Sequence, residues 1–82
     1  MSSVVVIFRI YPKEGRLDEA MSEIRTKLKP ADMRSEEVAF GIKLIRAMFK
    51  FDDAEKGSSK IEEQIKALEN VGEVEVEEET LL

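Results

Sequence analysis

The sequence predicts an α+β fold in which two helices cover one face of a four-stranded antiparallel sheet. Three observations lead to this prediction. The hydrophobic period changes along the chain in the order strand, helix, strand, strand, helix, strand. The chain has 82 residues, too few for two independent cores, so we expect a single domain over residues 1–82. An apolar fraction of 43% is ordinary for a folded domain.

The first strand and the first helix follow from a change of period. Residues 4–11 are rich in β-branched and aromatic residues, end at Pro12, and have apolar side chains on both faces, which is typical of an interior strand. Residues 16–28 are predicted to form a helix, because apolar residues recur at helical spacing until Pro30. Its apolar stripe is Leu17, Met21, Ile24 and Leu28.

The middle of the chain predicts two strands on either side of the hexapeptide Val38–Lys43. The polar residues 31–37 begin a strand that we expect to continue through Phe40 and to break at Gly41. Residues 42–51 alternate in a way that suits a long strand ending at two aspartates, Asp52 and Asp53. A helix remains an alternative for this segment, because Leu44, Ala47 and Met48 also fit helical spacing.

The last helix and strand complete the pattern. Residues 56–59 form a predicted turn, and Ser59 with Glu62 forms a predicted capping box at the start of a helix that Gly72 ends. The apolar stripe of this helix is Ile61, Ile65 and Leu68. A strand with one solvated face follows, in which Val74 and Val76 alternate with Glu73, Glu75 and Glu77, and residues 78–82 are left as a tail. The order β-α-β-β-α-β, with right-handed crossovers, predicts a ferredoxin-like sandwich.

The composition removes several classes of chemistry. The sequence has no cysteine and no histidine, so it offers no disulfide framework, no thiolate metal site and no imidazole base. The carboxylates Asp52, Asp53 and Glu55 lack the spacing of a calcium loop, which favours a solvated turn. We therefore expect no catalytic residue, no cofactor and no metal.

Charge is distributed unevenly along the chain. Residues 1–50 carry ten Lys/Arg and seven Asp/Glu, whereas residues 51–82 carry three Lys/Arg and eleven Asp/Glu. The acidic second part disfavours direct binding of nucleic acid, and its glutamates are interpreted as a solvated surface. The apolar run of residues 4–8 is too short for a signal peptide or a membrane span, so a cytoplasmic location and no membrane contact are expected.

Phe40 is the residue with the clearest candidate role. One interpretation places Phe40 in the core, with Gly41 as a strand break or bulge. The other makes Phe40 an aromatic anchor that projects from the turn into a partner's pocket. Three basic residues are candidates for positive charge near this turn, with plain surface charge as the alternative: Lys43, Arg46 and Lys50.

The run from Val38 to Asp53, the helix around residues 61–65 and the segment Val71–Val76 resemble the archaeal elongation factor 1-beta family. They also resemble the C-terminal exchange domain of its eukaryotic counterparts. The resemblance covers nearly the whole chain, although the first strand and helix agree in pattern only.

This resemblance implies a guanine-nucleotide exchange factor that promotes GDP release and GTP reloading on the GTPase elongation factor 1-alpha. Such a factor performs no covalent chemistry and is not an enzyme in that sense. The implied partner-binding residues are Phe40, Gly41, Lys43, Leu81 and Leu82. Eukaryotic relatives place a lysine next to the C-terminus, whereas the last basic residue here is Lys66. We therefore expect no magnesium displacement by a terminal lysine.

Two other functions are weighed against exchange. A ferredoxin-like domain that senses a small molecule needs a glycine-containing ligand loop after the first strand, and Gly15 lies there without an accompanying set of polar ligands. An acylphosphatase-like enzyme needs an arginine in a phosphate-binding loop and a later asparagine. Arg16 is present, but the only asparagine, Asn70, follows the second helix, which makes this function the weaker alternative.

Overall fold

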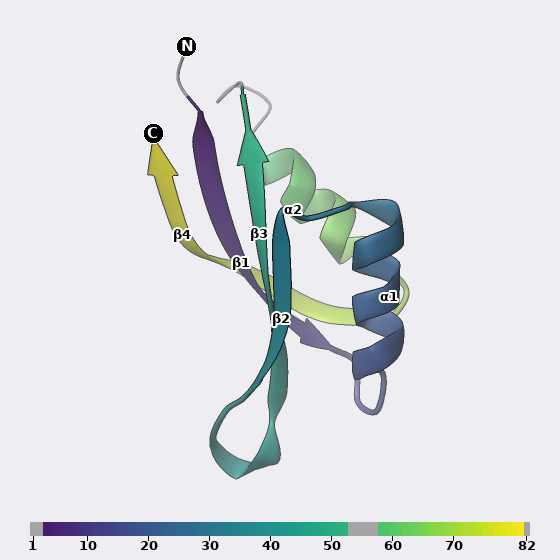
Figure 1. Cartoon of the computed structure of the whole chain (residues 1–82). Helices are drawn as coiled ribbons and strands as arrows, with labels where there is room; N and C mark the ends of the chain where they lie inside the picture. The colour runs from purple at the N-terminus through teal and green to yellow at the C-terminus, as the bar shows by residue number, and fades with distance from the viewer. Residues whose placement is uncertain (1–2, 53–57, 82) are drawn as a thin grey trace.

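A computed structural model describes residues 3–52 and 58–81 (Figure 1). Four strands form one antiparallel sheet in the order β2-β3-β1-β4, and two helices pack against it. The elements are β1 (Val4–Pro12), α1 (Leu17–Lys27), β2 (Asp32–Glu37), the 3-10 turn η1 (Ala39–Gly41), β3 (Lys43–Phe51), α2 (Ser58–Lys66) and β4 (Val71–Leu81). The predicted ferredoxin-like α+β fold is confirmed. None of the helices in residues 3–52 and 58–81 is long and apolar enough to cross a membrane.

The core lies between the sheet and the helices. Strand β1 is an interior strand, as predicted, and its alternate residues from Val4 to Ile10 are buried. Phe8 packs edge-on against Phe49 of β3, with ring centroids 5.7 Å apart. Each helix contributes one completely buried isoleucine, Ile24 and Ile65. Side chains of this size stabilise the fold by about 1.5–3 kcal/mol each when they leave water completely.

The helical stripes agree with the predicted ones. In α1, Ile24 is buried, together with Ala20, while the other members of the stripe pack against the core at its margin. In the second stripe Ile65 and Leu68 are buried and Ile61 is partly buried. The open question at residues 42–51 is also settled, because β3 pairs with both β1 and β2 and is a strand throughout.

Three predicted boundaries were wrong. Helix α2 begins at Ser58, so Ser59 lies inside it and is no capping residue, and Glu62 pairs instead with Lys66 at 3.2 Å. Gly72 does not end the helix, since α2 ends at Lys66 and Gly72 belongs to β4. The predicted tail is mostly strand, because hydrogen bonding to β1 continues along β4 to Leu81. Pairing with a central strand outweighs the weak strand propensity of consecutive glutamates.

The sheet divides into two pairs of strands at one end. Pairing between β1 and β3 stops at Ile10 and Ile45. Beyond this point β1 continues with β4 as far as Pro12, while β3 continues with β2 as far as Lys43 (Figure 1). We call residues 36–44, which extend past this division as a two-stranded hairpin, the arm. The arm carries η1 at its tip.

Candidate functional site

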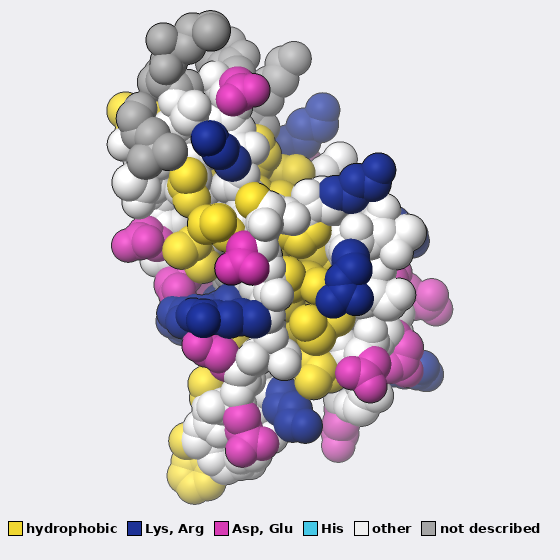
Figure 2. Space-filling model, viewed as in Figure 1, with side chains coloured by type: hydrophobic (Ala, Val, Ile, Leu, Met, Phe, Trp, Pro, Cys, Tyr) yellow, Lys and Arg dark blue, Asp and Glu magenta, His cyan; other side chains and the backbone are white. Residues whose placement is uncertain are grey.

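Phe40 lies at the tip of the arm and points away from the core. Its side chain is 99% exposed, so the interpretation of Phe40 as a core residue is wrong. Strand β2 ends at Glu37, three residues before Phe40, which is also contrary to the predicted strand. The side chains of Val38 and Ile42 are 40% and 52% exposed on either side of it. We call these three side chains the apolar tip, which forms the lower end of the molecule in Figure 2.

The backbone holds the tip in a tight turn. The N–H of Val38 donates a hydrogen bond of 2.7 Å to the carbonyl of Ile42, and the N–H of Ile42 donates one of 3.4 Å to that of Ala39. Phe40 and Gly41 have φ angles of 65° and 74°. Glycine adopts this left-handed conformation freely, but a residue with a Cβ does so at a cost of roughly 1–2 kcal/mol. Strain in an exposed aromatic residue is typical of a functional site.

Lys43 and Gly41 border a groove beside the tip. The groove has a volume of about 640 Å³ and lies between the arm and the loop that connects β1 to α1. Its apolar lining comes from Pro12, Leu17 and Ile42. Its charged lining is mixed in sign and consists of Lys13, Glu14, Asp18, Glu19 and Lys43. An apolar tip next to a polar groove suits contact with a protein surface better than enclosure of a small molecule.

The remaining candidate residues lie elsewhere. Leu81, 67% exposed, pairs with Val4 at the opposite end of β1 from the arm, about 20 Å along the sheet from the pair Ile10–Ile45. Leu82 lies outside the described residues. Lys50 pairs with Val5 and is far from the tip, so it does not supply charge to the Phe40 turn. The structure therefore brings together Phe40, Gly41 and Lys43 and separates them from Leu81.

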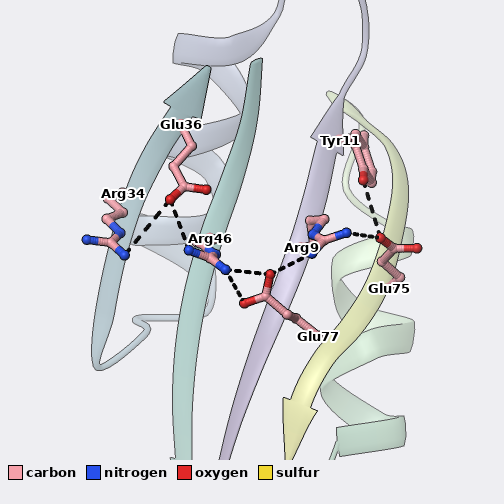
Figure 3. Close-up of polar contacts among 7 residues, drawn as sticks. All are labelled: Arg9, Tyr11, Arg34, Glu36, Arg46, Glu75 and Glu77. Atoms are coloured by element: carbon pink, nitrogen blue, oxygen red, sulfur yellow. Dashed lines mark hydrogen bonds and ion pairs between the residues drawn. The ribbon is translucent and has the colours of Figure 1, made fainter. Parts of the chain in front are cut away.

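An ion-pair cluster covers the open face of the sheet, on the side away from the helices (Figure 3). Glu77 of β4 accepts hydrogen bonds from Arg9 at 2.7 Å and from Arg46, whose Nη2 lies 2.6 Å from both carboxylate oxygens. Arg46 also donates to Glu36 of β2 at 2.9 Å. Glu75 accepts hydrogen bonds from Arg9 at 3.1 Å and from the hydroxyl of Tyr11 at 3.2 Å. The cluster thus connects all four strands.

A bulge in β4 lies within this cluster. Ile7 pairs with Glu78 and Phe8 pairs with Val76, which leaves Glu77 as the extra residue. The bulge brings Glu78 to the same face as Glu77, and both side chains line a second groove, which lies on the open face of the sheet. The interpretation of the β4 glutamates as a plain solvated surface is wrong for Glu77, because Arg9 and Arg46 contact its carboxylate and its side chain is only 17% exposed.

The charges in the cluster shift one another's protonation. Hydrogen bonds from Arg46 and Arg9 lower the pKa of Glu77, while partial burial opposes the shift. The hydrogen bond to Glu77 raises the pKa of Arg9 and of Arg46. All three groups are consequently charged at neutral pH. The sequence held one signal for this arrangement, since Arg9 and Arg46 interrupt the apolar pattern of two interior strands. It did not show that these strands pair so that both arginines reach Glu77.

The acidic turn at residues 52–55 and the pair Arg16 and Asn70 are the candidates weighed for metal binding or catalysis. No group of three or more acidic, cysteine or histidine side chains is placed to hold a metal ion in residues 3–52 and 58–81. Two members of the predicted acidic turn, Asp53 and Glu55, lie outside these residues. Arg16 pairs with Glu19 at 3.2 Å, and Asn70 donates 2.8 Å and 3.0 Å hydrogen bonds to Glu23. The two residues weighed for an acylphosphatase-like site thus make separate contacts.

The Asn70 contacts stabilise the negative charge of Glu23. Burial of Glu23 opposes ionisation, but the hydrogen bonds from Asn70 and the charge of Lys27 outweigh it and lower the pKa of the carboxyl. Glu23 therefore joins α1 to the segment before β4, and Asn70 has a structural role.

Comparison with known proteins assigns the family. The profile of the EF-1 guanine nucleotide exchange domain matches residues 5–82. The chain is 34% identical over 85 residues to elongation factor 1-beta of Hyperthermus butylicus, covering 94% of this chain and 91% of that protein. It is 32% identical to elongation factor 1-beta of Aeropyrum pernix, covering 94% and 93%. Elongation factor 1-beta of Ignicoccus hospitalis is also 32% identical, with coverage of 94% and 89%.

These matches confirm the resemblance to archaeal elongation factor 1-beta and support a role in guanine-nucleotide exchange. They favour exchange over the sensing domain and the acylphosphatase-like enzyme. An exposed aromatic on a projecting arm agrees with a protein that acts by contact. The chain belongs to the EF-1 guanine nucleotide exchange domain family.

Proposed function

We propose that residues 1–82 form one exchange domain that binds the GTPase elongation factor 1-alpha, speeds the release of GDP and allows GTP to reload. The single observation that carries this proposal is Phe40, which is fully exposed in a strained turn at the end of the arm. Leaving a phenylalanine in water forfeits roughly 1.5–3 kcal/mol of hydrophobic stabilisation. A pocket on a partner recovers that free energy, which makes Phe40 the anchor of the interface.

The chemistry of exchange needs no covalent step. An exchange protein that binds the empty GTPase more tightly than the GDP-bound form weakens GDP binding by the same ratio of affinities, because the coupling between two ligands is reciprocal. GTP then refills the site. Phe40 and the flanking apolar side chains supply contact area, Gly41 permits the turn, and Lys43 adds a positive charge next to it.

The C-terminal end provides a second candidate contact in this proposal. Leu81 is exposed, and Leu82 follows it in the sequence. The distance between Leu81 and the arm means that one partner touching both must extend along the length of the sheet. Substitutions at Leu81 and at Phe40 therefore test two separate parts of the proposed interface.

Release of fluorescent GDP from elongation factor 1-alpha of the same organism tests the proposal. We expect the wild-type protein to accelerate release and Phe40→Ala to reduce the acceleration by roughly tenfold or more, the loss typical of an anchor residue. Lys43→Gln should weaken acceleration, whereas the matched change Lys60→Gln on α2 should not. Unchanged acceleration in Phe40→Ala with a loss in Leu81→Ala would move the anchor to the C-terminal end. No acceleration by wild type would overturn the proposed function.

A further inference from the structure

We infer that Glu77 is a positioning residue that fixes the direction of the arm and thereby places Phe40 for its partner. The effect of Glu77 on the direction of the arm is argued from the ion-pair cluster. Its effect on binding of the partner rests on the proposed function. Glu77 belongs to β4, whereas Phe40 lies on the arm between β2 and β3, so the two residues share no strand. The cluster is the link between them.

The cluster lies where the sheet divides. Arg9 and Arg46 face each other across β1 and β3, one pair before pairing between these strands stops at Ile10 and Ile45. Past this point no strand of the described sheet flanks the arm on the β1 side, and hydrogen bonds between β2 and β3 alone hold it together. The direction of the arm is consequently set at its base.

Three arginines form one row across the base of the arm. Arg34, Arg46 and Arg9 occupy directly opposite positions on β2, β3 and β1. Like charges in this relation repel and destabilise a sheet. Glu77 neutralises two of them together, because it contacts Arg46 through both oxygens and Arg9 through one (Figure 3).

Glu77 therefore links the two pairs of strands at the point where the sheet divides. It joins β4, which follows β1, to β3, which enters the arm, and Arg46 passes the connection on to Glu36 in the arm itself. Removing the charge of Glu77 leaves Arg9 and Arg46 facing each other without their shared carboxylate. We expect the arm to widen its range of directions while the core beneath it stays packed, since no core side chain is altered.

The experiment compares Glu77→Gln with Glu78→Gln. Both remove one negative charge from adjacent residues of β4. Of these two glutamates, only Glu77 has an ion-pair partner among the described residues. Amide residual dipolar couplings of residues 36–44, relative to those of α1 and α2, report the direction of the arm. The expected result is a change in the arm couplings of Glu77→Gln alone. Couplings that match the wild type would overturn the inference, whether or not the protein accelerates GDP release from a GTPase.

Nucleotide release supplies the functional readout. Glu77→Gln should raise the factor concentration needed for half-maximal GDP release by roughly tenfold, equivalent to about 1.4 kcal/mol, with Glu78→Gln unchanged. Glu77→Asp, which keeps the charge on a shorter side chain, should recover part of the loss. In a Phe40→Ala background the effect of Glu77→Gln should disappear, because the two residues act as a unit. An equal effect in both backgrounds would contradict positioning.

These readouts separate the two proposals. If the wild-type protein fails to accelerate GDP release, the proposed function is wrong, and the dipolar couplings still decide whether Glu77 directs the arm. If the wild type accelerates release and Glu77→Gln changes neither the couplings nor the half-maximal concentration, exchange stands and the inference about Glu77 is overturned.

Discussion

Phe49 and Phe40 lie nine residues apart on the same hairpin and have opposite environments. Phe49 packs against Phe8 between sheet and helices and is almost completely buried, whereas Phe40 is almost completely exposed at the tip of the arm. We call the part of the sheet outside the arm, together with its two helices, the body. Buried aromatic side chains stabilise the body. The arm, which no helix of the described structure covers, leaves its aromatic residue accessible to a partner. In the proposed function, the same type of side chain serves folding in one region and recognition in the other.

The largest expected effect comes from breaking the body. Phe8→Ala removes a completely buried ring that contacts Phe49, and we expect it to lower the free energy of unfolding by about 3–5 kcal/mol. Urea denaturation followed by circular dichroism measures this change. A loss below 1 kcal/mol would show that the body does not depend on this aromatic pair.

A smaller effect on the free energy of unfolding is expected at the base of the arm, where the contribution of the ion pairs depends on pH. The pKa of Glu77 in the folded protein lies below its ordinary value of 4.5, so its contribution to stability is complete above that value and is lost as pH falls through the lowered pKa. Glu77→Gln should remove up to about 1 kcal/mol of stability at pH 7 and little at pH 2. Unfolding measured over this range checks the prediction, with Glu78→Gln as the control. Identical pH profiles for wild type and Glu77→Gln would contradict it.

The smallest effect on stability is expected at the tip. Phe40→Ala removes a side chain that is 99% exposed, so the free energy of unfolding should change by less than about 0.5 kcal/mol. Thermal unfolding of Phe40→Ala beside Phe8→Ala measures the contrast directly. A loss above 1 kcal/mol at Phe40 would mean that the tip packs against the protein itself, which would remove the distinction between the two regions.

The fold was largely predictable because each element carries its own period. The alternation in β1 and the helical stripes around Ile24 and Ile65 depend on local spacing, and the structure reproduces them. The boundaries near Gly72 and residues 78–81 were not predictable in the same way. Their strand conformation depends on hydrogen bonds to β1, whose paired residues lie 59 to 77 positions away in the sequence.

The candidate site was predictable only in part. Phe40 and Gly41 stood out because a large aromatic beside a glycine interrupts two strand patterns. Whether Phe40 was buried remained open, since an apolar residue at a strand end fits a core equally well. Alternation correctly placed Glu77 on the face of the sheet that Glu75 occupies, but it could not show that Arg9 and Arg46 from two other strands cover the Glu77 carboxylate there.

The sequence by itself determined the α+β class, the order of the elements, the aliphatic and aromatic core, and the absence of cysteine and histidine chemistry. These properties follow from residue type and from spacing within ten to fifteen positions. Only the tertiary structure decided that Phe40 is exposed and that Glu77 joins two arginines at the base of the arm. Both depend on where strands distant in sequence stop pairing, and the division of the sheet at Ile10 and Ile45 sets that point.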